Sequence, residues 1–88
     1  MISTKEKSII IKIAGRYRIK RIFLFGSGLT KKKMRDIDLA VEGLPAKDFF
    51  RFYGDLLLSL TKPVDLIDLS QDSKFNRLIR QEGFLIYG

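Results

Sequence analysis

Apolar residues recur at helical intervals in three stretches of the chain, the first near its amino terminus. Ser3 and Glu6 have the spacing of a capping box, and the apolar positions that follow predict a helix from about Thr4 to Ala14 or Tyr17. The same periodicity over residues 46–60 predicts a second helix that packs on a sheet. Its apolar stripe consists of Phe49, Phe52, Tyr53, Leu56, Leu57 and Leu60.

A third helical pattern lies near the carboxyl end of the sequence. Phe75, Leu78 and Ile79 make an i, i+3, i+4 face behind the N-cap candidates of residues 70–73, which predicts a last helix ending near residues 82–83. Between these helices, short apolar or alternating runs are typical of strands. The strand candidates are residues 22–25, 36–42 and 64–69, with residues 84–87 as a short terminal strand or a docking tail.

This order of elements predicts a single domain of the α/β (α+β) class over residues 1–88, with a small mixed sheet flanked by helices. A chain of this size buries only about 60 to 65% of its unfolded surface, so a partner or self-association would add stability. Phe50 and Leu58 fall outside the apolar stripe of the second helix, which hints at a protein partner.

Composition excludes several classes of protein. The hydrophobic fraction of 45% is that of a globular chain, and no apolar run approaches the 18 or so residues that cross a bilayer. The first residues lack the pattern of a signal peptide, and the absence of cysteine rules out a disulfide framework. We therefore expect a cytoplasmic protein.

The formal net charge of +7 favours an anionic partner. Two basic clusters flank a glycine-serine turn in the sequence, and this placement favours phosphate over membrane as the target. Solvated loops around a hairpin would give the same pattern. The clusters are Arg16, Arg18, Lys20 and Arg21 before the turn, and Lys31, Lys32, Lys33 and Arg35 after it.

Two carboxylates open the second predicted strand. Asp36 and Asp38 point to the same side of a strand, about 6.5 to 7 Å apart, while Ile37, Leu39 and Val41 fill the core side. Repulsion between the two acids would raise a pKa or attract a cation, and Mg²⁺ is the cation that carboxylates and substrate phosphates hold together. The chain has no His or Cys for a zinc site, although a solvated strand face also carries such acids.

The turn before these acids is a candidate phosphate cradle. Gly26, Ser27 and Gly28 follow the buried run of residues 22–25, so backbone N–H groups and a hydroxyl are available to an anion at the strand's carboxyl end. A hairpin turn is the alternative. On the third strand, Asp65 has the parity of the acidic face, whereas Asp68 does not and is assigned to the strand terminus or a loop.

These motifs together resemble the DNA polymerase β-like nucleotidyltransferase superfamily, and within it the minimal, MNT-type nucleotidyltransferases. The resemblance spans nearly all of the chain from Ile22 onward. It is carried by the sequence LFGS of residues 24–27, DIDL of 36–39, PVDLIDL of 63–69 and RQEGFLIY of 80–87. One departure is that the family often continues GSxAxG with an arginine, whereas residues 26–35 read GSGLTKKKMR.

The resemblance implies a palm in which Asp36, Asp38 and Asp65 are catalytic and bind two Mg²⁺ ions. It also implies that the turn holds the triphosphate of ATP and that AMP passes to a hydroxyl acceptor. The nucleotide-binding residues would be Gly26, Ser27 and Gly28, with Lys33 and Arg35 supplying positive charge.

Minimal members of the family are commonly encoded beside HEPN-domain ribonuclease toxins and act as antitoxins that adenylylate a toxin tyrosine. The resemblance therefore implies a HEPN partner. Two alternatives stay open: a catalytically weak or inactive antitoxin that neutralises its partner by binding, and a nucleotidyltransferase that acts on RNA or a small molecule. The oligomeric state is also open.

Overall fold

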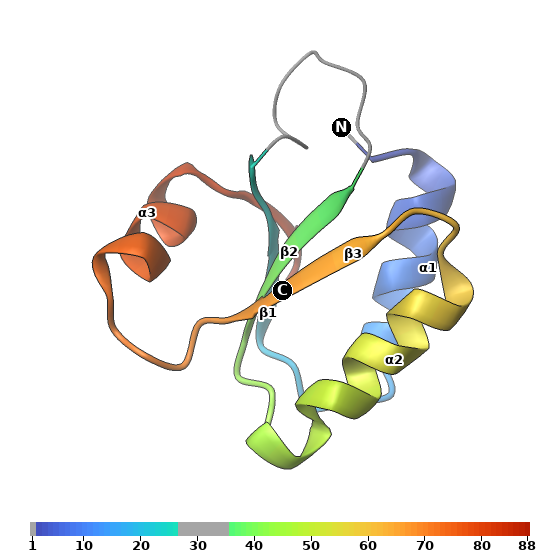
Figure 1. Cartoon of the computed structure of the whole chain (residues 1–88), viewed down its shortest axis with the longest axis horizontal. Helices are drawn as coiled ribbons and strands as arrows, with labels where there is room; N and C mark the ends of the chain where they lie inside the picture. The colour runs from blue at the N-terminus through green and yellow to red at the C-terminus, as the bar shows by residue number, and fades with distance from the viewer. Residues whose placement is uncertain (1, 27–35) are drawn as a thin grey trace.

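The computed structural model describes residues 2–26 and 36–88, and it contains a sheet with helices on both sides (Figure 1). Helices α1 and α2 cover one face of the sheet, and α3 lies on the other. The elements in chain order are α1 (Thr4–Ala14), β1 (Arg21–Leu24), β2 (Ile37–Glu42), the 3-10 turn η2 (Ala46–Asp48), α2 (Phe49–Ser59), β3 (Val64–Asp68), α3 (Lys74–Glu82) and β4 (Phe84–Tyr87).

The sheet has the strand order β3-β2-β1-β4. Strands β2 and β3 are parallel, because the helix α2 carries the chain back between them, and β1 pairs antiparallel with both β2 and β4. The predicted mixed sheet flanked by helices is therefore confirmed. Of the two alternatives for residues 84–87, the structure has the terminal strand, which pairs with β1.

The first helix begins where the sequence predicts. The Ser3 hydroxyl accepts a hydrogen bond from the Glu6 amide at 3.1 Å, and the Ser3 amide donates to Glu6 Oε1 at 2.8 Å. Burial would raise the pKa of Glu6, but the hydrogen bonds from Ser3 and the ion pair with Lys62 lower it overall. The capping box fixes the start of α1, and the ion pair of Glu6 with Lys62 links it to the segment that follows α2.

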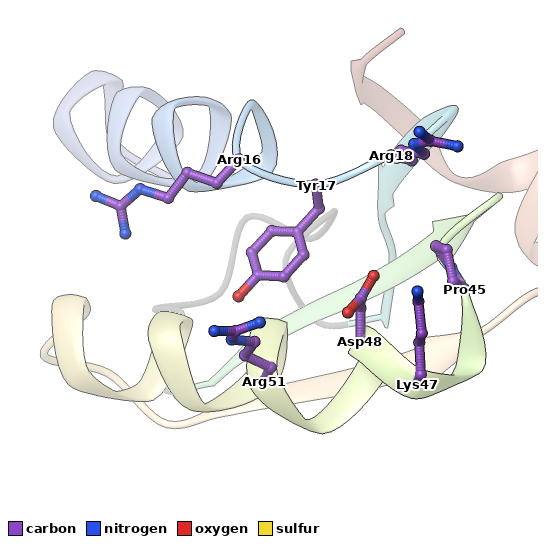
Figure 2. Close-up of a pocket in the computed structure, with 7 residues that line it drawn as sticks. All are labelled: Arg16, Tyr17, Arg18, Pro45, Lys47, Asp48 and Arg51. Atoms are coloured by element: carbon purple, nitrogen blue, oxygen red, sulfur yellow. The ribbon is translucent and has the colours of Figure 1, made fainter.

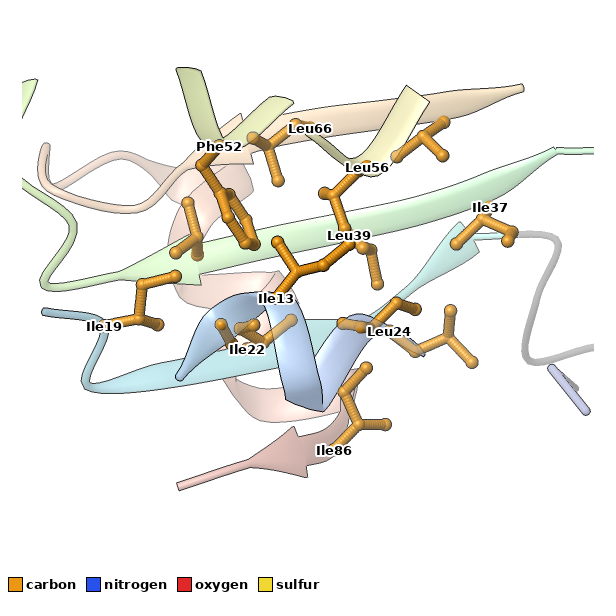
Figure 3. Packing of buried hydrophobic residues seen from close by; sticks show 14 of the residues in the cluster. Ile13, Ile19, Ile22, Leu24, Ile37, Leu39, Phe52, Leu56, Leu66 and Ile86 are labelled. Carbon is orange, nitrogen blue, oxygen red and sulfur yellow. The ribbon is translucent and has the colours of Figure 1, made fainter. Parts of the chain in front are cut away.

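The larger core lies between the sheet and the pair α1 and α2 (Figure 3). Phe52, Leu56 and Leu60 of the predicted stripe are buried in it, and Phe49 and Tyr53 are partly buried. The prediction was wrong for one member of the stripe. Leu57 is 48% exposed, because the buried face of α2 is narrower than the sequence periodicity suggests.

The alternation in β2 predicted that the opposite face of the sheet meets solvent, but only part of that face does. Helix α3 covers its middle and buries Phe23, Ala40, Leu69 and Ile79 in a second, smaller core. The predicted face of α3 was only partly right, since Ile79 is buried but Phe75 and Leu78 are about half exposed. The other buried residue of α3 is Asn76. Its side-chain amide donates to the Gln71 carbonyl at 2.7 Å and to the Asp68 carbonyl.

In the part of the chain that the structure describes, every helix is too short or too polar to cross a membrane.

Candidate functional site

Just past the carboxyl end of β1, Gly26 lies directly beside Asp38. Gly26 has φ +69°, a conformation that favours glycine, and a Cβ atom there would lie 2.6 Å from Asp38 Oδ2. The chain just before it is held in place, because the Phe25 amide donates to the Asp38 carbonyl at 3.0 Å. The missing side chain at Gly26 is therefore what lets the backbone approach the carboxylate.

Two of the predicted acids are direct neighbours across the parallel strands. Asp38 of β2 and Asp65 of β3 are partners in the strand register, so their side chains leave the same face of the sheet on strands about 4.8 Å apart. Asp38 is half-buried and Asp65 is exposed. The parity expected for Asp65 is thus the observed one.

Asp36 lies one residue before β2 and is exposed. It has the sequence parity of Asp38, although the strand begins only at Ile37. The remaining predicted phosphate-binding residues, Ser27, Gly28, Lys33 and Arg35, lie outside the described residues. The structure thus brings together Gly26, Asp38 and Asp65, and places Asp36 at the start of the same strand.

The donor atoms at this site suit a hard cation. Across residues 2–26 and 36–88, no group of three or more His, Cys, Asp or Glu side chains forms a metal cluster. Mg²⁺ commonly uses one or two protein carboxylates and completes its shell with water and substrate phosphates. The neighbouring Asp38 and Asp65 carboxylates fit that mode of binding, in which the substrate supplies further oxygens.

At the other end of β2, Glu42 lies in a different environment. Its carboxylate accepts hydrogen bonds from Arg21 of β1 and from Arg80 Nε of α3, the latter at 3.1 Å. These arginines, Arg21 foremost, outweigh the effect of burial and lower the pKa of Glu42. Glu42 is therefore a structural ion-pair residue, which sequence reasoning missed because α3 brings Arg80 to it from 38 positions away.

Asp68 ends β3, as predicted, and does not join the acidic pair. Its Oδ1 atom accepts a hydrogen bond from the Ser70 amide at 2.9 Å, which turns the chain out of the strand. Asp65 is thus the β3 acid that faces Asp38.

An apolar hollow of about 200 Å³ lies against Gly26 on the side of α3. Phe25 and Phe75 form one wall, with their rings edge to face at 6.0 Å, and Leu78 and Gly83 contribute to the rest. This hollow explains why Phe75 and Leu78 are exposed, because they line a hollow against Gly26 rather than the core. Helical periodicity alone could not distinguish these two environments.

The first basic cluster flanks the turn in the sequence but does not surround Gly26 in space. Strand β1 separates Arg16 and Arg18, which precede it, from Gly26, which follows it. Arg21 is engaged by Glu42. Proximity in sequence was misleading here because an extended strand carries the chain about 3.3 Å per residue away from its start.

A mixed sheet that presents paired carboxylates beside a glycine turn is the arrangement of a nucleotidyltransferase palm. The model of the family described as "Polymerase beta, Nucleotidyltransferase" matches residues 8–88, and the chain belongs to this family. No curated protein sequence matches the chain.

Solved structures similar to this one come from toxin-antitoxin complexes. The MntA-HepT complex contains a chain of 25% identity with a TM-score of 0.74, covering 98% of this chain and 73% of that one. A toxin-antitoxin structure with AMP-PNP gives 27% identity and a TM-score of 0.72, covering 93% and 73%. The complex of a tri-AMPylated Shewanella oneidensis HEPN toxin with its MNT antitoxin gives 26% identity and a TM-score of 0.75, covering 99% and 73%.

Proposed function

We propose that this protein transfers AMP from ATP to a hydroxyl group of a HEPN-domain toxin and thereby acts as its antitoxin. The observation that carries the proposal is the placement of Asp38 and Asp65 side by side on parallel strands, with the Gly26 backbone against Asp38. Two carboxylates beside the glycine backbone are suited to a nucleotide's phosphates and to the cation that accompanies them.

In the proposed reaction the acceptor oxygen attacks the α-phosphorus of ATP. The bond from that phosphorus to the bridging oxygen of the β-phosphate breaks, and pyrophosphate leaves. The Asp65 carboxylate accepts the proton of the acceptor hydroxyl as its oxygen attacks, and the backbone from Gly26 onward holds the triphosphate. Asp36, Asp38 and Asp65 would hold Mg²⁺, which, when bound, supplies charge stabilisation at the phosphates.

The nucleotide and the acceptor are supported by the structural neighbours. One neighbour is a toxin-antitoxin structure with AMP-PNP, and another is a tri-AMPylated HEPN toxin bound to an MNT antitoxin. These relatives are about one quarter identical to this chain and match almost all of it. ATP as donor and a HEPN toxin as acceptor are therefore the substrates that we infer.

The test is transfer of label from α-labelled ATP, with Mg²⁺, to a purified HEPN-domain toxin. We expect label on the toxin and loss of its ribonuclease activity, and both should vanish with Asp38→Asn. Glu42→Gln is the matched control, because it removes a carboxylate from the same face of β2 at the end away from Gly26. Circular dichroism would show that both variants fold.

Three outcomes would contradict the proposal. Inhibition of the toxin without label would mean that the protein acts by occlusion alone. Label on RNA or on a small molecule in place of the toxin would mean a different acceptor. Equal loss of transfer in Asp38→Asn and Glu42→Gln would mean that the acidic pair beside Gly26 has no special role.

A further inference from the structure

A second candidate site lies at the end of the sheet away from Gly26. The segment after α1 and the start of α2 face each other across a cleft of about 410 Å³ (Figure 2). Arg16, Tyr17 and Arg18 contribute from one side, and Lys47 and Arg51 from the other. The cleft continues past Arg51 toward Asp55. Two segments that lie far apart in sequence thus build one concave basic surface.

The cations of this cleft are available to a ligand. Among residues 2–26 and 36–88, Arg16, Arg18, Lys47 and Arg51 form no ion pair, whereas the arginines of β1 and α3 all do. Asp48 and Asp55 also line the cleft, so four cations face two carboxylates. The cleft therefore has an excess of positive charge, and its concave shape lets several cations act on one bound anion.

Tyr17 forms a fixed wall between these cations. Its hydroxyl donates to Asp55 Oδ2 at 2.5 Å, and its ring packs edge to face on Phe52 at 5.4 Å. Burial, and then the hydrogen bond to Asp55, raise the pKa of the Tyr17 hydroxyl. One of the two carboxylates in the cleft is thus already engaged by the protein itself.

We propose that this cleft binds the phosphate backbone of single-stranded nucleic acid. Three of its four cations are arginines, whose planar, weakly hydrated guanidinium groups match phosphate oxygens in pairs. A half-buried tyrosine among arginines is also a surface on which an unpaired base packs. The cleft is separated from Gly26 by the length of β1, so this binding does not serve the proposed transfer site.

The experiment measures binding of fluorescent single strands of about 12 nucleotides, oligo(U) RNA and oligo(dT) DNA, by anisotropy at salt concentrations from about 50 to 200 mM. Four phosphate contacts predict a slope of about −2.8 in log K against log salt, from about −0.7 per contact. The double variant Arg16→Gln/Arg51→Gln should bind at least about tenfold more weakly at low salt and flatten the slope by about 1.4.

The matched control is Lys5→Gln/Lys7→Gln, which removes the same charge from exposed positions in the first two turns of α1. We expect it to change binding by less than about twofold, because these lysines lie outside the cleft. Arg16 and Arg51 are exposed, so their variants should unfold at the wild-type temperature. A variant with lysine at both positions, which keeps the charge, should retain most of the salt slope.

Binding of both strands with the expected loss would support a site for phosphodiesters, and a preference for RNA would add contact with the ribose. Equal weakening by the cleft variant and the control would overturn the proposal, because net charge alone would then explain the binding. No measurable binding at low salt would also overturn it. Tighter binding of an oligo-glutamate peptide, lost in Arg16→Gln/Arg51→Gln, would reassign the cleft to an acidic protein partner.

Discussion

The two ends of β2 carry carboxylates on the same face of the sheet, in opposite surroundings. At the end near Gly26, Asp38 stands beside a second acid, Asp65, and beside backbone that has no side chain. At the other end, Glu42 lies between Arg21 and Arg80. The strand presents both acids in the same way, so the difference comes from the elements next to them.

This contrast separates a carboxylate for chemistry from a carboxylate for stability. Pairing Glu42 with two guanidinium groups satisfies its charge inside the protein and lowers its pKa. Asp38 instead lies next to a second carboxylate, Asp65, and two neighbouring carboxylates can share a bound cation. The end of β2 near Gly26 is therefore arranged like a site that binds an external cation and a nucleotide. The end with Glu42 is arranged like a structural ion-pair network.

The largest expected effect is on transfer of AMP by acid variants at the Gly26 end. Asp38→Asn and Asp65→Asn should each lower the rate of toxin labelling by about 10³-fold, while Glu42→Gln should change it by less than about threefold. Because residues that act as one unit are not additive, the Asp38→Asn/Asp65→Asn double variant should lose no more than the worse single variant. Single-turnover labelling with saturating ATP measures all four.

Additive losses in the double variant would show that Asp38 and Asp65 act independently, and would contradict the view that they form one site. The comparison would also fail if Glu42→Gln lost as much activity as Asp38→Asn.

Next in size is the effect of a side chain at Gly26. Gly26→Ala places a Cβ atom against Asp38 Oδ2 at a positive φ, so we expect a loss of about 10²-fold in transfer and about 1 to 3 kcal/mol in stability. The matched control is Gly54→Ala, in the middle of α2 with nothing within 4 Å of the added atom. It should raise stability by about 0.5 to 1 kcal/mol and leave transfer unchanged. Wild-type activity in Gly26→Ala would mean that the close approach is not needed.

The elements of this fold follow largely from local patterns in the sequence. The start of α1 depends on Ser3 and Glu6, and the end of β3 coincides with the hydrogen bond that Asp68 accepts from the Ser70 amide, so both depend on neighbours in the chain. The exposure of Leu57, Phe75 and Leu78 could not be predicted in this way. Periodicity shows that a face is apolar, but only the packed structure shows whether the core, a hollow or solvent meets it.

In the candidate site, too, local patterns predict some features and only the packed structure shows the others. Strand parity predicts that Asp38 and Asp65 share a face, and the register then makes them direct partners. The arginines that hold Glu42 could not be predicted, since Arg80 arrives from α3 across the sheet. The separation of Arg16 from the glycine turn was also hidden, because a sequence shows that residues are close along the chain but not that a strand intervenes.

A smaller effect is expected on stability at the Glu42 end. The folded state lowers the pKa of Glu42, so the stabilisation is present above the ordinary glutamate pKa of about 4.3 and is lost as the pH falls through the folded value. Glu42→Gln should therefore cost about 1 to 2 kcal/mol at neutral pH, allowing for the partial exposure of Arg21 and Arg80, and less at pH 3, where part of this stabilisation is lost. Urea unfolding of both proteins at the two pH values measures the difference, and a constant difference would contradict the assignment.

The smallest effect separates a partly buried arginine from an exposed one on the same helix. Arg80 donates to Glu42 and to the Leu69 carbonyl, and its side chain is 34% exposed, whereas Arg77 pairs with Asp72 where both side chains are mostly in solvent. We expect Arg80→Gln to lower the free energy of unfolding by about 1 kcal/mol and Arg77→Gln by less than about 0.5 kcal/mol. Raising the salt concentration should shrink the smaller loss further, because exposed pairs are screened. Equal losses in urea unfolding would mean that the exposed pair of Arg77 and Asp72 stabilises the protein as much as the pair of Arg80 and Glu42. Glu42 would then have no special structural role at its end of β2.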